Sequence, residues 1–298
     1  MRTRILITTG NGAFTEGGWE KPEHTDDEIV VKSIMTGVCR SDIDMMNGEF
    51  GPLPIHMQGH EGLGKVIHIG KNIKDVKHGD YVATRGEPAY ADYYNVKKNE
   101  YVVVPDAQPK YILEPVACGI NLIDQANDQI KQRQGVHARM LILGSGFLAW
   151  VAYHTMRLNG YFYRIDVVGS SNKDLWGDIL QSDTAGNYDV VIDLSSRLDI
   201  FEKDILRENA LIIFGTQKDV TTNFSNLLWK ACTMIFPSPR NPRFIDCMHF
   251  AKHWVENGYL EVDYFWTKSY NRDTQWQQAF ADGVDRPNGY SRGYIKWD

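Results

Sequence analysis

Three short segments in the first 119 residues carry side chains that bind metal ions. The segment Gly-Val-Cys-Arg-Ser-Asp contains Cys39, the segment Gly-His-Glu-Gly contains His60 and Glu61, and the segment Leu-Glu-Pro-Val-Ala-Cys-Gly contains Glu114. Thiolate, imidazole and carboxylate groups are the side chains that bind zinc in proteins. These four residues would form a mixed zinc site, although no two of them have the spacing of a tight metal-binding pair.

A second chemical signal lies near the middle of the chain, where the apolar run 141–143 meets two glycines and then a helical pattern. Closely spaced glycines allow a tight turn, and the N–H groups at the start of the next helix suit a pyrophosphate. The pattern Gly-x-Gly-x-x-Ala is weak by itself because it is common. The predicted cofactor contacts in this turn are Gly144, Gly146, Phe147 and Leu148. Apolar packing explains the last two equally well.

Short strands are predicted to position the three ligand segments. The predicted strands, rich in β-branched and aromatic residues and separated by Gly, Asn and Asp, are 28–35, 64–70, 79–84, 90–96 and 101–105. Such a series is typical of a small barrel or sandwich.

After Cys118 the pattern changes to apolar strands that alternate with helices. Helices are predicted at 120–134, 147–158 and 244–257, and strands at 140–143, 164–168, 188–193, 210–215 and 233–236. This alternation indicates βαβ units around a parallel sheet. The tail from residue 259 returns to strand character, with a helix near 274–282.

The three ligand segments, the glycine turn and their order along the chain resemble the zinc-dependent medium-chain alcohol dehydrogenases, in particular the branch of sorbitol and threonine dehydrogenases. The resemblance extends from about residue 28 to the tail, where Trp-Thr-Lys-Ser-Tyr at 266–270 is similar to a late strand of the family. It implies an α/β protein with two domains. A β-rich GroES-like catalytic domain would comprise 1–118 and 251–298, and a Rossmann domain with a doubly wound parallel sheet would comprise 119–250.

The resemblance also implies the zinc ligands. Cys39 would supply the thiolate and His60 the imidazole, while Glu61 and Glu114 would share the remaining positions with water or substrate. Zinc acts as a Lewis acid on an alcohol oxygen and lowers its pKa, and hydride then passes to a nicotinamide. The family's lobe of four cysteines has no counterpart between residues 79 and 90, so we expect one catalytic zinc and no structural zinc.

Two neighbours of Cys39 receive roles from the same resemblance. Ser41 would relay a proton between the alcohol and solvent, so the predicted catalytic residues are Ser41, Cys39 and His60. Arg40 would reach the pyrophosphate of the cofactor.

The strand predicted at 164–168 bears on the choice of cofactor, since an acidic residue at its end usually binds the ribose of NAD. Here the end position is Gly169, and the segment that follows resembles the Ser-rich, Lys-ended loops of NADP-dependent cinnamyl alcohol dehydrogenases. The residues predicted to bind the 2′-phosphate are Gly169, Ser170, Ser171 and Lys173. We therefore favour NADP(H) over NAD(H). A shifted strand would instead give Asp166 the ribose role and favour NAD.

Composition limits the class of partner. The net charge of −6 argues against a general nucleic-acid binder, and no apolar run is long enough for a membrane helix. The four cysteines show no close pairing, which favours a reducing cytoplasm. We expect a small-molecule alcohol or aldehyde substrate and, from the resemblance, a homodimer or homotetramer joined through the cofactor domains, with 233–236 as the candidate edge strand.

Several alternatives remain open at this stage. Cys39 could be an inert buried thiol, and Glu114 could simply occupy the start of a helix. The remaining histidines, His24 and His68 among them, have no ligand-like neighbours in sequence. The whole chain could be a zinc-free enone or quinone reductase of the same superfamily, or a nucleotide-binding protein without catalytic activity.

Overall fold

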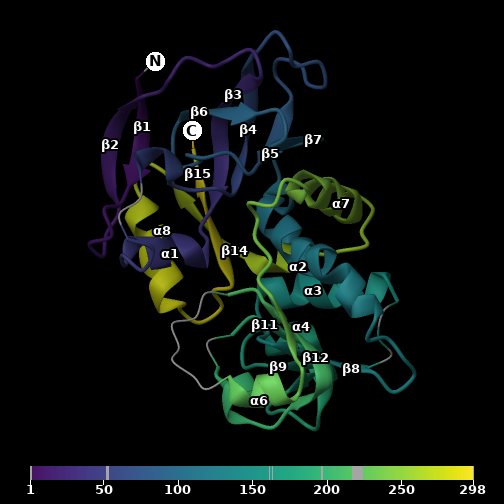
Figure 1. Ribbon diagram of the computed structural model, residues 1–298. Helices are drawn as coiled ribbons and strands as arrows, with labels where there is room; N and C mark the ends of the chain where they lie inside the picture. The colour runs from purple at the N-terminus through teal and green to yellow at the C-terminus, as the bar shows by residue number, and fades with distance from the viewer. Residues whose placement is uncertain are drawn as a thin grey trace. The chain divides into compact units, whose positions relative to one another are not determined.

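The computed structural model describes residues 2–51, 54–160, 162, 164–195, 197–216 and 224–297 of the 298-residue chain. The chain forms two compact units, of which the first comprises Met1–Pro115 with Met248–Asp298 and the second Val116–Cys247. It passes from one unit to the other within two helices, α2 (Glu114–Lys131) and α7 (Phe244–Glu256), which are labelled in Figure 1.

The second unit contains a six-stranded parallel sheet in the order β10-β9-β8-β11-β12-β13. Its strands are β8 (Arg139–Leu143), β9 (Arg164–Val168), β10 (Leu180–Gln181), β11 (Tyr188–Asp193), β12 (Leu206–Phe214) and β13 (Thr233–Ile235). The chain enters at the central strand β8, builds one side of the sheet and then the other. This is the doubly wound order of a Rossmann fold, which binds ligands where the winding reverses, here outside the carboxyl ends of β8 and β11.

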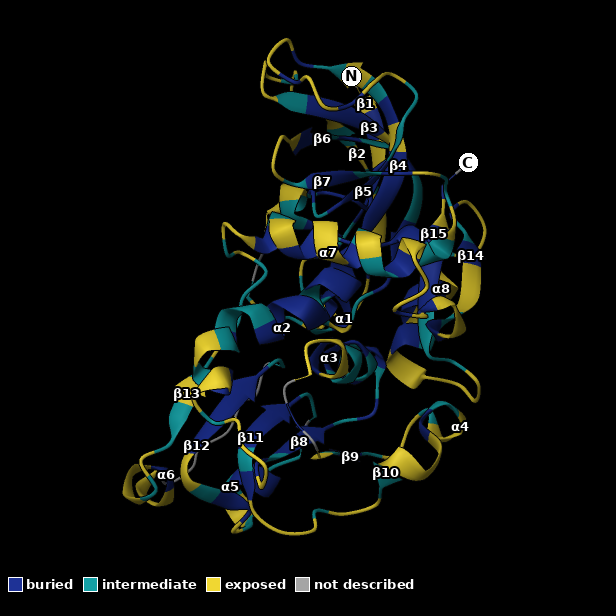
Figure 2. Cartoon of the chain, turned by 90° about the vertical axis from the view of Figure 1, so that its right-hand side faces the viewer, coloured by how far each residue is buried: buried dark blue, intermediate teal, exposed yellow. Residues whose placement is uncertain are grey.

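Alternating side chains of these strands pack into two apolar layers. Met140 and Ile142 belong to a cluster that includes residues of α2 and α3 (Phe147–Leu158). Leu141 and Leu143 belong to a second cluster, with residues of the short helices α5 (Asp199–Glu202) and α6 (Ser225–Trp229). Because both faces are covered, β8, β11 and residues 210–214 of β12 are almost wholly buried, as the dark blue colour of these strands in Figure 2 shows.

The first unit is built on a mainly antiparallel sheet in the order β14-β15-β3-β4-β5-β7, with β6 also paired to β3. Its strands are β3 (Glu28–Gly37), β4 (Gly62–Ile69), β5 (Tyr81–Thr84), β6 (Tyr93–Lys97), β7 (Tyr101–Val104), β14 (Trp266–Asn271) and β15 (Arg292–Lys296). Tyr294 of β15 lies opposite Gly37 of β3, so the late strands β14 and β15 extend a sheet whose other members precede residue 105. The predicted fold class, a β-rich GroES-like part and a parallel Rossmann sheet, is confirmed.

Two helices of the first unit pack together with its sheet. Ile43 of α1 (Arg40–Met46) and Phe280 of α8 (Trp276–Asp285) share an apolar cluster with Ile295 of β15. The remaining short helical segments are η1 (Ile55–Met57), η2 (Pro109–Tyr111), α4 (Lys173–Trp176), η3 (Gly177–Ile179) and η4 (Asp263–Phe265). Among the helices that the structure describes, none is long and apolar enough to cross a membrane.

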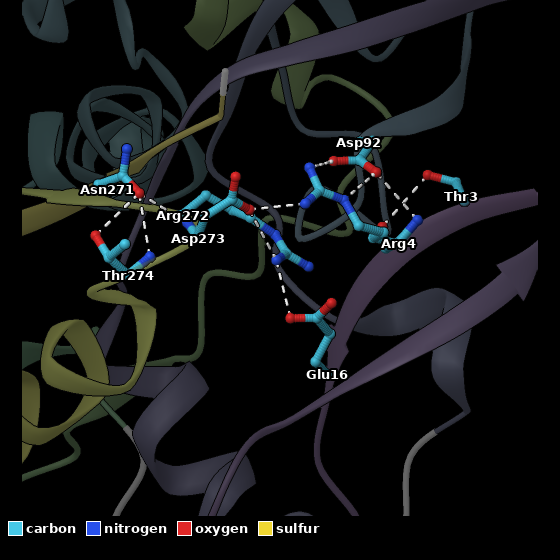
Figure 3. Close-up of polar contacts among 8 residues, drawn as sticks. All are labelled: Thr3, Arg4, Glu16, Asp92, Asn271, Arg272, Asp273 and Thr274. Atoms are coloured by element: carbon cyan, nitrogen blue, oxygen red, sulfur yellow. Dashed lines mark hydrogen bonds and ion pairs between the residues drawn. The ribbon is translucent and has the colours of Figure 1, made fainter.

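A network of ion pairs fixes the N-terminal hairpin, β1 (Arg2–Ile7) and β2 (Thr15–Glu20), to the turn after β14. The guanidinium of Arg4 donates to both carboxylate oxygens of Asp92 at 3.0 Å and to Asp273 at 2.7 Å (Figure 3). Arg272 is buried and donates to Glu16 at 2.9 Å. The first and last parts of the chain are therefore joined within this unit.

Candidate active site

Cys39 lies at the junction between β3 and α1, where the strand ends at Gly37 and the helix begins at Arg40. It occupies the N-cap position in an extended conformation, and its backbone N–H donates to Oδ2 of Asp42 at 2.8 Å. An acidic residue at this spacing satisfies an otherwise unpaired N–H group and fixes how the helix starts. The segment Cys-Arg-Ser-Asp is therefore a helix start as well as a candidate ligand segment.

His60 and Glu61 precede β4 in a loop that depends on two glycines. Gly59 has φ +75°, and a Cβ at this position would lie only 2.7 Å from the ring of Tyr90. Gly37, on the neighbouring strand β3, leaves room for the carboxylate of Glu61, because a Cβ there would lie 2.0 Å from Oε2. The glycines around these segments thus permit the close approach of the candidate ligands.

Three of the four predicted zinc ligands converge. One ligand atom each from Cys39, His60 and Glu61 lies within 4.8 Å of the other two; Glu61 is fully buried, and Cys39 and His60 are partly buried. Glu114 is buried at the first residue of α2 and lies outside this group, although its negative charge helps to raise the pKa of His60. Its role as a ligand stays a prediction, beside the alternative that it serves the helix start.

Asp42 and Tyr90 support His60, and the sequence analysis assigned neither of them a role. Asp42 is fully buried, with Oδ1 lying 3.6 Å from Nδ1 of His60 and Oδ2 accepting a hydrogen bond from the Tyr90 hydroxyl at 2.7 Å. We assign the Nδ1 proton of His60 to the side of Asp42, which leaves Nε2 as the metal-binding nitrogen. The signal for Asp42 was visible in sequence, because it follows Cys39 at the spacing of a capping box.

The two predicted neighbours of Cys39 point to different partners. Oγ of Ser41 lies 3.5 Å from Nε2 of His60, so its hydroxyl is beside the candidate ligands. Arg40 is exposed, and its guanidinium donates to Asp44 one turn further along α1 at 2.7 Å. Its predicted contact with a pyrophosphate therefore remains a prediction.

Arg292 holds the Glu61 carboxylate and is the main site residue that sequence reasoning missed. Its Nη2 lies 2.5 Å from Glu61, where it contacts both carboxylate oxygens, and its guanidinium lies over the ring of Trp266 at 4.9 Å. The two residues come from β15 and the loop before β4, at opposite ends of the sequence. No local pattern could have paired them.

Burial and mutual charge shift the proton affinities in this cluster. Burial, followed by the nearby Glu61 carboxylate, raises the pKa of the Cys39 thiol. Burial by itself would lower the pKa of His60, but the charge of Asp42 and the interactions with Cys39 and Glu114 outweigh it and raise that pKa well above its usual value. Removing the proton from a thiol or an imidazolium accompanies metal binding, so the group is chemically suited to exchange protons for a cation.

In the second unit, the predicted glycine turn follows β8. Gly144 has φ +115°, and a Cβ there would lie 2.9 Å from the carbonyl oxygen of Leu194. Gly146 is the N-cap of α3, and among the described residues no heavy atom lies within 4 Å of the position of its missing Cβ. The turn therefore presents backbone N–H groups at a helix start with space in front of them, as a pyrophosphate requires. Phe147 is buried, which fits packing, and Leu148 is partly exposed.

The loop after β9 is anchored to the glycine turn through Ser145. The Ser145 hydroxyl accepts a hydrogen bond from the backbone N–H of Ser171 at 2.9 Å, and a Cβ on Gly169 would lie 2.4 Å from this hydroxyl. Ser170, Ser171 and Lys173 are exposed beside the turn. The predicted cofactor residues of the two segments are thus neighbours, whereas their cofactor contacts remain predictions.

Asp166, the alternative ribose ligand, is occupied within the sheet. It is buried and accepts hydrogen bonds from Arg139 at 2.6 Å, Arg164 at 2.9 Å and the Tyr188 hydroxyl at 3.0 Å. Burial opposes the charge of this carboxylate, but the hydrogen bonds prevail and lower its pKa. β9 ends at Val168, so Gly169 is the residue just beyond the strand, as expected.

The first unit thus brings together a thiol, an imidazole and a carboxylate, and the second unit has the doubly wound sheet of a Rossmann fold. Residues 25–109 match the model of the alcohol dehydrogenase GroES-like domain. The predicted resemblance to the zinc-dependent medium-chain alcohol dehydrogenases is confirmed by this match and by the named proteins below.

Among curated proteins, the chain is similar to D-arabitol-phosphate dehydrogenase of Enterococcus avium, with 23% identity over 87% of each chain. Among solved structures, it is similar to an alcohol dehydrogenase of Escherichia coli in complex with NADH, with a TM-score of 0.79 and 13% identity over 99% of each chain. It is also similar to the cobalt- and zinc-bound thermostable alcohol dehydrogenase of Pyrobaculum aerophilum, with a TM-score of 0.78 and 16% identity over the full length of both. At these identities the structures establish the shared fold.

Proposed function

We propose that this protein is a zinc-dependent alcohol dehydrogenase or aldehyde reductase that transfers hydride between a small alcohol and NADP(H). The observation that carries the proposal is the convergence of Cys39, His60 and Glu61 within 4.8 Å. A thiolate, an imidazole and a carboxylate with an open position are typical of catalytic rather than structural zinc sites. The dehydrogenases to which the chain is similar support the reaction class.

The donor set fits zinc. Cys39 Sγ and His60 Nε2 would hold the ion, and Glu61 or Glu114 would complete the site in exchange with water or substrate. When bound, zinc supplies a Lewis acid that lowers the pKa of an alcohol. The buried carboxylate of Asp42 lies 3.6 Å from Nδ1 of His60, where its negative charge favours a proton on that nitrogen and leaves Nε2 for the ion.

Ser41 is placed to move a proton. Its hydroxyl, 3.5 Å from Nε2 of His60, lies beside the candidate ligand atoms and is only partly buried. Oγ can accept a proton from the alcohol and pass it outward through its own O–H, so that the charge does not remain in the buried cluster.

The loop from Gly169 to Lys173 supports the choice of NADP(H). The occupied Asp166 is unavailable to the ribose, no carboxylate stands at Gly169, and Lys173 adds positive charge beside two serine hydroxyls. The structurally similar Escherichia coli protein holds NADH, and the proposed preference for NADP(H) therefore rests on this loop of the present chain and not on that similarity.

Replacing Lys173 by alanine should weaken NADPH binding about tenfold, or about 1.4 kcal/mol, and leave NADH binding unchanged. Fluorescence titration with both cofactors checks this, with Lys131→Ala as the control, and equal losses for both cofactors would contradict it.

We also propose a homodimer or homotetramer joined through the second unit. β13 is at the edge of the six-stranded sheet, and apolar side chains are exposed on it, directly after it and on the preceding helix α6. These are Leu228, Trp229, Met234 and Phe236. Exposed apolar patches of this kind mark interaction surfaces.

The deciding experiment is metal analysis of the purified protein combined with an alcohol oxidation assay. Cys39→Ala should lose both zinc and activity, whereas Cys118→Ala, a matched change outside the converging group, should keep both. Activity without metal would instead indicate a zinc-free reductase, and intact nucleotide binding without turnover on a broad alcohol panel would indicate a binding protein. Retention of zinc and rate by Cys39→Ala would remove this residue from the site.

A further inference from the structure

Two histidine rings from separate segments of the first unit lie against each other, outside the candidate active site. The ring centroids of His24 and His68 are 4.0 Å apart, and their planes are inclined by 58°. His24 belongs to the segment before β3 and is partly exposed, whereas His68 is an exposed residue of β4. Sequence alone gave neither residue a ligand partner, because the fold brings them together.

The strand register explains how His68 comes to face that segment. Val30 of β3 is paired with His68 of β4 on one side and with Asn95 of β6 on the other. Directly opposite residues of antiparallel strands point to the same face of a sheet. His68, Val30 and Asn95 therefore form one row, with the buried Val30 in the middle.

Asn95 holds the segment that carries His24 across this row. Its Nδ2 donates to the backbone carbonyls of Pro22 at 3.3 Å and Glu23 at 3.5 Å. Its Oδ1 accepts a hydrogen bond at 2.7 Å from the buried ammonium of Lys21. The residues immediately before His24 are thus fixed to β6, and the imidazole of His24 lies against that of His68 on β4.

The ring separation is close to what a shared metal ion demands. With metal–nitrogen bonds of 2.0–2.1 Å, two imidazoles on one tetrahedral or octahedral ion have centroids about 4.5–5 Å apart. The observed separation of 4.0 Å is shorter than this. Rotation of the partly exposed His24 side chain and the exposed His68 side chain can widen it to that range. Acidic residues are also frequent in the same segment: Asp26 is paired with Lys71 at 2.6 Å, and Glu23, Asp27 and Glu28 add negative charge close to His24 in sequence.

We propose that His24 and His68 form a second metal site, which binds a divalent transition-metal ion such as Zn²⁺ or Ni²⁺ through the two imidazoles, with water in the remaining positions. Neutral imidazole is a preferred ligand for these ions. The ion would link the segment before β3 to β4 and would stabilise the first unit, because it binds a geometry that the unfolded chain lacks. This proposal does not depend on the reaction proposed above.

The test is calorimetric titration of untagged full-length protein with Ni²⁺ in the Cys39→Ala background, in which the converging group has lost its thiolate. We expect one binding site, which His24→Ala or His68→Ala weakens by about tenfold or more, since each removes one of two protein ligands. The matched control is His253→Ala, because His249 and His253 are a second exposed pair, one turn apart on α7. This variant should bind Ni²⁺ as tightly as its parent.

A thermal readout accompanies the titration. Ni²⁺ should raise the melting temperature of the Cys39→Ala protein but not that of the Cys39→Ala/His68→Gln protein, whose substitution keeps a polar side chain at an exposed strand position. The proposal is overturned if folded Cys39→Ala protein binds no Ni²⁺. It is equally overturned if the His24 and His68 variants keep the affinity, or if His253→Ala removes the binding.

Discussion

The contact between Arg292 and Glu61 is the most consequential pair at the scale of single residues. Glu61 is fully buried, and the guanidinium that lies against both of its oxygens is itself largely buried. A carboxylate in such a place needs a cation as compensation. A metal ion that took Glu61 as a ligand would compete with Arg292 for the same oxygens, so in the proposed zinc site the arginine would limit how readily this carboxylate binds the ion.

Removing only the arginine should therefore be costly. Arg292→Met leaves the Glu61 charge buried without its partner and should lower the free energy of unfolding by about 3–5 kcal/mol. Urea denaturation in the presence of EDTA measures this without a contribution from metal. The double variant Glu61→Gln/Arg292→Met should recover part of the loss, and a double variant less stable than the single one would show that the charge is not the cause.

The Asp166 carboxylate predicts a pH effect on stability. Hydrogen bonds from Arg139, Arg164 and Tyr188 lower its pKa in the folded protein, so it stabilises the fold above the pKa of an unfolded aspartate, about 3.9, and this contribution is lost as the pH falls through the lower folded value. Asp166→Asn should cost about 2 kcal/mol at pH 7. Its deficit should shrink in urea denaturation at decreasing pH below about 4, whereas the exposed control Asp174→Asn should behave like wild type throughout.

At the scale of elements, the two glycines of the turn after β8 are expected to have different roles, Gly144 in the stability of the fold and Gly146 in cofactor binding. Gly144 needs its positive φ and is crowded by Leu194, whereas the position of a Cβ on Gly146 is open among the described residues. Gly144→Ala should thus lower the melting temperature. Gly146→Ala should leave it unchanged and weaken NADPH binding about tenfold, which is about 1.4 kcal/mol, because its methyl group would occupy pyrophosphate space. Thermal melts and cofactor titrations of both variants check this, and unaltered NADPH affinity in Gly146→Ala would remove the turn from the cofactor site.

The loop after β9, which is anchored to this turn, shows why one obvious substitution is a poor test of cofactor choice. Aspartate at position 169 would restore the acidic strand end of NAD-binding proteins. Its Cβ, however, would lie 2.4 Å from Oγ and 2.8 Å from the backbone nitrogen of Ser145. A backbone atom cannot yield as a flexible side chain can, so Gly169→Asp would disturb the turn itself.

Periodic patterns made part of the architecture predictable. The helix at 147–158 and the strands at 164–168 and 188–193 have the predicted bounds, because both strands contain runs of buried apolar residues and α3 is bounded by glycines. α2 begins at Glu114 rather than near residue 120, because Pro115 fits the first turn of a helix, where its missing N–H group has no partner to lose. β12 begins at Leu206 rather than at 210, because polar residues at its exposed beginning hide the strand pattern.

The candidate site was predictable where its residues are near each other in sequence and unpredictable where they are not. The segments around Cys39 and His60 have recognisable local patterns. Arg292 and the pair of His24 and His68 depend on strand pairings between distant segments. No feature within either segment encodes such a contact.

At the scale of the whole molecule, the proposed assembly predicts a defined change in mass. Met234→Lys places a charge on the edge strand β13, and burying that charge between two copies would be unfavourable. Light scattering after size exclusion should show a mass reduced to that of a single chain. Phe250→Lys, a comparable change of an exposed apolar side chain on α7, should keep the wild-type mass. A wild-type protein that is already monomeric would contradict the proposed assembly.

The discontinuity of the first unit has a consequence for biosynthesis. β3 acquires its neighbour β15 only after residues 292–296 have been synthesised, and the cation opposite Glu61 arrives with that strand. The second unit is continuous from 116 to 247 and can close while the C-terminal segment is still in the exit tunnel. Until β15 is in place, the nascent chain exposes an unpaired strand edge and a carboxylate without its counterion. A chain cut before residue 292 would consequently keep the second unit and leave an aggregation-prone first unit attached to it.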